Sequence, residues 1–147
     1  MNIDEMQAGR EMDALIAEKV MGISVQTFGD TCYLVNYCLK KENGDLYYFN
    51  GECPTRASIE EAKKLIPRYS TDLAAAWEVE EKIIQLDFIN EYLEALQIIV
   101  NGVERGWTMT GIIIGHTYTV EQTINLVHAS PEQRCRAALK ALGIELC

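Results

Sequence analysis

Four residues near the apolar segment 107–114 carry side chains that a small, anionic, planar ligand requires. They are Arg105, Trp107, His116 and Tyr118. An aromatic ring can stack on a base, and a guanidinium offers a forked pair of donors to a phosphate. This combination favours a nucleotide as the ligand. If 107–114 is one extended strand of about 30 Å, however, a second subunit or a folded-back loop must close the site. The alternative is that Trp107 packs in the core and Arg105 lies in a solvated turn.

Three further arginines lie beside predicted helix starts. Arg68 precedes the start at Ser70-Thr71, and Arg134 and Arg136 follow the start at Ser130. The free backbone N–H groups of a helix N-terminus can bind phosphate. Their ordinary role is to be capped by a side chain, and that interpretation stays open for both starts.

No familiar catalytic motif occurs in the sequence. Phosphate-binding loops, nucleophile elbows and HExxH zinc motifs are all absent. The cysteines lack the close pairing of a structural zinc site, and a nucleophilic Cys53 assisted by His116 or His128 rests on no specific pattern. We therefore predict no enzyme activity, no cofactor and no bound metal, and we expect chelators to have no effect.

The net charge of the 147-residue chain is −9. Binding to DNA or RNA depends on a surplus of lysine and arginine, so nucleic acid is not an expected partner. The longest apolar run is far shorter than a membrane span, and the polar N-terminus predicts no signal peptide. The odd number of cysteines, five at irregular spacing, is typical of a reducing compartment. These features predict a cytoplasmic protein without membrane contact.

Apolar periodicity and capping residues predict helices at 8–21, 58–65, 71–86 and from Ser130 onwards. In the third of these, Trp77 lies in a broad apolar arc that also contains Glu80. A carboxylate in that arc needs a partner or must reach the edge of the arc. Trp77 and Leu139 are predicted core residues. For a fully buried Trp77, replacement by alanine would cost about 3–5 kcal/mol.

Alternating and β-branched residues predict strands in 23–50, with an Asn43-Gly44 turn. Residues 87–95 are ambiguous. A strand at 97–100, a turn at Asn101-Gly102 and the strand 107–114 would form a second hairpin, and 123–129 a last strand. Hairpin turns of this kind favour antiparallel pairing.

Three stretches resemble the phage ABA sandwich domain family: GREMDALIAEKVMG (9–22), YSTDLAAAWEVEEKI (69–83) and ASPEQRCRAALKAL (129–142). They occur in the family's order and cover the three main helices. The resemblance implies a protein of bacterial viruses and prophages and carries no catalytic residues. Two features depart from the family pattern: Glu80 replaces an apolar residue, and the strand-rich segment 23–66 is an elaboration.

The expected fold is therefore a single α/β domain over 1–147, a small mostly antiparallel sheet sandwiched by helices. The expected function is a non-catalytic, counter-defence phage protein that sequesters a nucleotide immune signal. The alternative is an inhibitor or adaptor that binds a host protein. Apolar strands with unpaired edges also predict a homo-oligomer.

Overall fold

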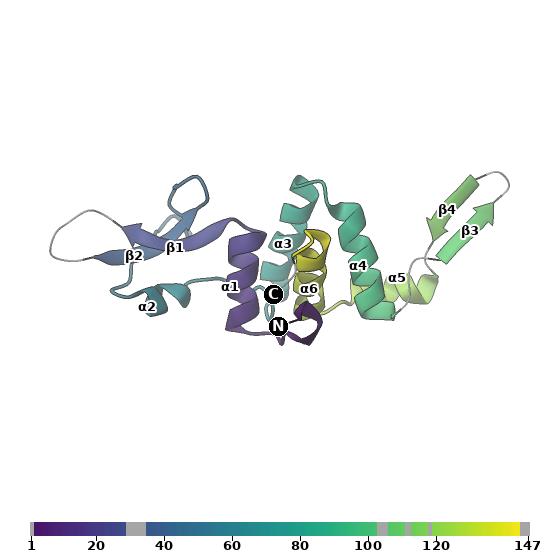
Figure 1. Cartoon of the computed structure of the whole chain (residues 1–147), viewed down its shortest axis with the longest axis horizontal. Coiled ribbons are helices and arrows are strands. Elements are labelled where there is room, and N and C mark those ends of the chain that lie inside the picture. Colours follow the sequence, from purple (N-terminus) through teal and green to yellow (C-terminus); the bar gives the residue numbers. More distant parts are fainter. Residues whose placement is uncertain (1, 29–34, 103–105, 111–112, 118, 145–147) are drawn as a thin grey trace.

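The computed structural model describes residues 2–28, 35–102, 106–110, 113–117 and 119–144. Figure 1 shows an elongated molecule with helices in the middle and a β-hairpin at either end. The elements in chain order are η1 (Ile3–Glu5), α1 (Arg10–Lys19), β1 (Ile23–Phe28), β2 (Asn36–Lys41), α2 (Ile59–Lys63), α3 (Leu73–Gln85), α4 (Ile89–Asn101), β3 (Gly106–Thr110), β4 (Ile113–Thr117), α5 (Val120–Val127) and α6 (Pro131–Ala141).

The core lies where α6 packs against α3, α4 and α1. Its fully buried side chains include Met12 and Ile16 of α1, Ile83 of α3, and Cys135 and Leu139 of α6. The prediction that Leu139 is a core residue is confirmed. Burial also raises the pKa of the Cys135 thiol to about 12, as expected for a cysteine that behaves as a small apolar residue.

The small sheet is formed by β1 and β2, which pair antiparallel from Ile23 opposite Lys41 to Phe28 opposite Asn36. Helix α1 packs against β1, and α2 packs against both strands. The predicted class, an α/β fold with helices packed against a small antiparallel sheet, is confirmed. The Asn43-Gly44 turn is also present, with Gly44 at a φ of 88°. Within the described residues, 45–50 contribute only isolated bridges to their neighbours.

The predicted strand at 97–100 is wrong, because these residues belong to α4. Tyr92 and Leu96 share its buried face at the spacing of one helical turn. Gly102 adopts a left-handed conformation at the C-cap of α4. Asn101-Gly102 is thus a helix stop rather than a hairpin turn.

The predicted strand at 123–129 is wrong as well, since α5 covers most of it. Thr119 caps this helix, accepting a hydrogen bond from the backbone N–H of Gln122, whose side chain binds back to the cap. Such a capping box specifies a helix start. Short apolar segments are compatible with strand and helix alike, and here the cap decides.

The segment 107–114 is not one strand either. It is divided between β3 and β4, which pair antiparallel as a second hairpin. The hairpin ladder satisfies backbone N–H and C=O groups that a lone strand would leave unpaired.

The start of α6 agrees with prediction, with Ser130 and Gln133 forming a reciprocal capping box and Pro131 in the first turn. The start of α3 does not. Its cap is Asp72, whose carboxylate accepts hydrogen bonds from Ala74 and Ala75, and not Ser70 or Thr71. Ser70 is buried instead, donating its hydroxyl to Asp13 at 2.7 Å. The contact with Asp13 therefore withdraws Ser70 from capping, and the helix starts after Asp72.

Candidate functional site

Glu80 on α3 forms an ion pair with Arg134 on α6 and accepts a hydrogen bond from the Tyr92 hydroxyl on α4. The Arg134 side chain is 8% exposed and that of Glu80 23%. Arg134 also donates to the carbonyls of Ala129, at 3.0 Å, and Val127, at 2.9 Å. Glu80 thus has the partner that its place in an apolar arc demanded. Burial, followed by the Glu80 carboxylate, raises the pKa of Tyr92.

Arg134, a predicted phosphate ligand, is committed to this network. Its Nε and both terminal nitrogens have protein partners. A nucleotide phosphate would have to displace the Glu80 carboxylate, which occupies the position of the anion. The network links three helices and is structural.

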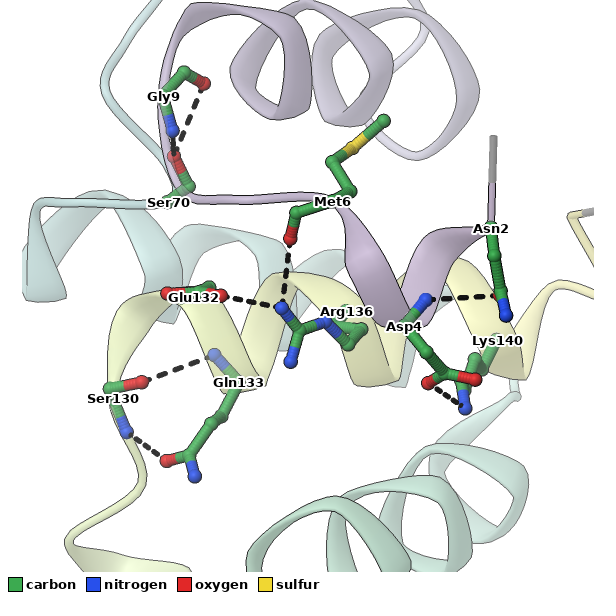
Figure 2. A network of polar contacts seen from close by, with 10 residues as sticks. All are labelled: Asn2, Asp4, Met6, Gly9, Ser70, Ser130, Glu132, Gln133, Arg136 and Lys140. Carbon is green, nitrogen blue, oxygen red and sulfur yellow. Dashed lines mark hydrogen bonds and ion pairs between the residues drawn. The ribbon is translucent and has the colours of Figure 1, made fainter. Parts of the chain in front are cut away.

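Arg136 is held on the other side of α6. Figure 2 shows its guanidinium between Glu132 and the carbonyl of Met6, to which it donates at 2.8 Å. Lys140, one turn further on, pairs with Asp4. Together these two cations fasten the N-terminal segment to α6. Arg68 is exposed and lies elsewhere, in the turn before α3.

Two of the four residues predicted to bind a planar anionic ligand, Arg105 and Tyr118, lie outside the residues that the structure describes. The register of β3 and β4 places Trp107 opposite His116. The expected separation of about 30 Å between them is therefore wrong, because the chain folds back as a hairpin.

Neither predicted helix start is open to a phosphate. The Asp72 carboxylate occupies the first N–H groups of α3. The α6 start is closed by Ser130 and Gln133 and has Glu132 in its first turn. A carboxylate at a helix N-terminus satisfies the positive end of the dipole and repels a second anion.

A cleft of about 1010 Å³ opens where the ends of α1 and α3 meet β1 and the turn after β2. Lys19, Lys41 and Lys82 line it, together with Glu18, Glu42 and Tyr47. Lys19 pairs with Glu18 at 2.7 Å, whereas Lys41 and Lys82 have no ion pair within the described part of the chain. Two helix C-termini border the cleft, and their partial negative charges offset some of this positive charge.

A stripe of apolar side chains on α3 is exposed. Leu73, Trp77 and Ile84 are 42%, 52% and 58% exposed. They recur at helical spacing with Glu80, so all four share one side of the helix. Ala76, Val79 and Ile83 each precede a residue of this stripe by one position, and they form the buried side of the helix. The prediction that Trp77 is a core residue is therefore wrong: the apolar arc of α3 is wider than the strip that α6 and α4 cover.

Helix α5 has an exposed stripe of its own. Val120, Ile124 and Val127 are 79%, 52% and 68% exposed and repeat at one and two helical turns. No residue of α5 is fully buried. The helix packs against α4, while the three side chains of the stripe stay exposed. They are therefore available to a partner.

Arg134 joins the two stripes. Its guanidinium binds Glu80, which lies in the α3 stripe, and the carbonyl of Val127, which ends the α5 stripe. We use the name α3–α5 face for the two stripes together: Leu73, Trp77 and Ile84 on α3, and Val120, Ile124 and Val127 on α5. Single exposed apolar residues are ordinary, but a group that includes a half-exposed tryptophan marks a contact surface.

The family model of the phage ABA sandwich domain matches residues 14–139. The chain belongs to the phage ABA sandwich domain family. The match runs from α1 to α6 and supports a phage protein. Comparison of this phage domain with curated proteins and with solved structures finds no significant match.

In this phage domain the sequence contained signals for the α3–α5 face that were assigned to other structures. Leu73, Trp77 and Ile84 belong to the predicted apolar arc, and Trp77 is a predicted core residue of that arc. Val120, Ile124 and Val127 were missed because α5 was interpreted as loop and strand. The Thr119 and Gln122 capping box was the signal that could have identified the helix.

Proposed function

We propose that this phage protein is a non-catalytic factor that acts in the bacterial host by binding a host protein through the α3–α5 face. The observation that carries the proposal is Trp77, which is 52% exposed in the middle of a helix whose other side is fully buried. Tryptophan loses little side-chain entropy on binding and dominates the energy of many interfaces. A phage protein that binds a host protein in this way is suited to counter-defence.

Binding at the α3–α5 face should also cost less rearrangement than binding in the cleft between α1 and α3. The apolar side chains of this face already lie exposed, and the helices that carry them are fixed by the Glu80, Arg134 and Tyr92 network. Binding therefore needs no rearrangement of the core, which lowers its cost. The homo-oligomer expected from the sequence would use another surface, such as the strand edges of a hairpin.

Site-specific photocrosslinking tests the proposal in host cells. A photoreactive amino acid at position 77 or 84 is expected to give the same host-protein adduct, because both positions lie in the exposed stripe of α3. The matched control is position 60 on α2, which is also exposed and should give no such adduct. The purified partner should then bind the Trp77→Ala variant at least tenfold more weakly, about 1.4 kcal/mol or more.

Two outcomes contradict the proposal. The first is an adduct of equal yield from position 60, which would show nonspecific proximity. The second is crosslinking of the chain only to itself, which would make the α3–α5 face an interface between copies. A melting temperature of Trp77→Ala close to that of the wild type shows that weakened binding is not unfolding.

Sequestration of a nucleotide signal is the second candidate function, and the cleft between α1 and α3 favours it. Lys41 and Lys82, which form no ion pair among the described residues, bring cations into a concave site, and Tyr47 supplies a ring. It ranks second because both neighbouring helix C-termini are negative and because Lys82 already serves the last turn of α3.

Calorimetry with cyclic dinucleotides, cyclic trinucleotides and cyclic ADP-ribose isomers tests this candidate. Sequestration requires binding tighter than about 10 µM and recovery of the ligand unchanged. The Lys41→Ala and Lys82→Ala variants should each weaken binding tenfold or more, and Lys63→Ala on α2 should not. Failure of every ligand, or its hydrolysis, would exclude a sponge.

A further inference from the structure

The helices that carry and flank the α3–α5 face are strongly acidic. Helices α3, α4 and α5 contain six carboxylates and one lysine. The carboxylates are Glu78, Glu80, Glu81, Glu91, Glu94 and Glu121. Arg134 neutralises only Glu80. An approaching partner therefore meets apolar side chains set in a negative field.

Two of these carboxylates border the apolar stripes directly. Glu81 lies one helical turn after Trp77 and one turn before Ile84, and Glu121 lies one turn before Ile124. Both are exposed, and neither forms an ion pair within the described residues. Carboxylates at the rim of an apolar patch attract cationic partners and repel acidic ones.

This charge pattern disfavours a second copy as the occupant. A two-fold dimer through the face would bring the same patch of each copy together. Glu81 and Glu121 would then meet like charges from a chain whose net charge is −9. A complementary occupant has lysines or arginines beside its apolar side chains.

We infer that the partner of the α3–α5 face is a basic amphipathic helix of a host protein. This rests on the proposed function and specifies its partner class. The apolar residues of that helix would pack on the α3 stripe around Trp77, while its cations would pair with Glu81. A helix is the matching element because exposed helical ridges with one-turn spacing pack into the grooves of another helix.

The probe is a synthetic Leu/Lys peptide of about five turns, with leucines in one helical stripe. Two peptides serve as controls: a Leu/Glu peptide of the same pattern and a scrambled Leu/Lys peptide of the same composition. The chain has two tryptophans, so a Trp107→Phe variant makes Trp77 the sole indole reporter. Binding of the Leu/Lys peptide should shift its emission to shorter wavelength, because the ring becomes buried.

The charge part of the inference has its own variants. Glu81→Lys/Glu121→Lys should weaken binding of the Leu/Lys peptide at least tenfold. Glu11→Lys/Glu60→Lys changes the net charge equally, at exposed positions on α1 and α2, and should have a much smaller effect. Raising the salt from about 50 to 300 mM should also weaken binding, because it screens the rim charges.

Equal binding of the scrambled peptide would contradict the claim that the partner is an amphipathic helix. It would indicate only a general attraction of basic peptides to an acidic protein. Equal binding of the Leu/Glu peptide would overturn the basic character of the partner. If no peptide binds while the crosslinked host protein still does, the partner class is wrong and the proposed function stands. If crosslinking also fails, the proposed function falls with it.

Discussion

Replacing Arg134 with alanine is expected to lower the free energy of unfolding by about 3 kcal/mol. The change leaves the Glu80 carboxylate without its cation while three-quarters of that side chain remains covered. Removing one partner of a buried pair costs about 3–5 kcal/mol, and the lower end applies because Glu80 retains some solvent. The carbonyls of Ala129 and Val127 also lose their donors. Urea denaturation followed by circular dichroism measures the difference.

A double substitution separates the charge from the packing. Arg134→Met/Glu80→Met should recover much of the lost stability, because it removes both buried charges and keeps apolar volume. Lys64→Ala, which breaks the exposed pair with Glu61, should leave the denaturation midpoint unchanged. A loss for Arg134→Ala no larger than that for Lys64→Ala would show that the Arg134 network contributes no stability.

Leu139→Ala and Trp77→Ala should have opposite consequences, although the tryptophan is the larger side chain. Leu139 is completely buried, and truncating such a leucine costs about 2–5 kcal/mol through lost transfer energy and the remaining cavity. Trp77 is half-exposed, so its truncation should cost less than about 1 kcal/mol of stability. Partner binding should change in the reverse order. Thermal melts of both variants, run with the binding assay, measure the contrast.

The result that contradicts this assignment is a large stability loss for Trp77→Ala. That loss would mean that the indole is covered in solution, and the α3–α5 face would no longer offer its main binding residue. A small loss for Leu139→Ala would place the core elsewhere. Each variant thus checks the phasing of the helix that carries it, α3 for Trp77 and α6 for Leu139.

The two substitutions also illustrate the limit of periodicity. The pattern of α3 predicts correctly that one side is apolar, but the apolar positions span a wider arc than the neighbouring helices cover. Which part of the arc is buried depends on where α4 and α6 lie. Trp77 and Ile83 are both large apolar residues of the same arc, yet one is exposed and the other is not.

Capping chemistry was predictable where it is local. Ser130, Pro131 and Gln133 specify the start of α6 without help from the rest of the chain, and Ser58 does the same for α2. The start of α3 was not predictable in this way. Ser70, Thr71 and Asp72 are all competent caps, and the hydrogen bond from Ser70 to Asp13 removes one of them.

The family, the α/β class, the main helices and the acidic character could all be predicted from the sequence, because they depend on composition, periodicity and neighbouring residues. The site could be recognised only from the packing of the helices. Packing of α3 against α6 pairs Glu80 with Arg134, 54 residues apart in the sequence. This ion pair occupies an arginine that was predicted to bind a ligand. The packing of the helices also leaves Trp77 and the apolar stripe of α5 exposed. Contacts over such separations depend on how whole helices pack, and no local pattern encodes that packing.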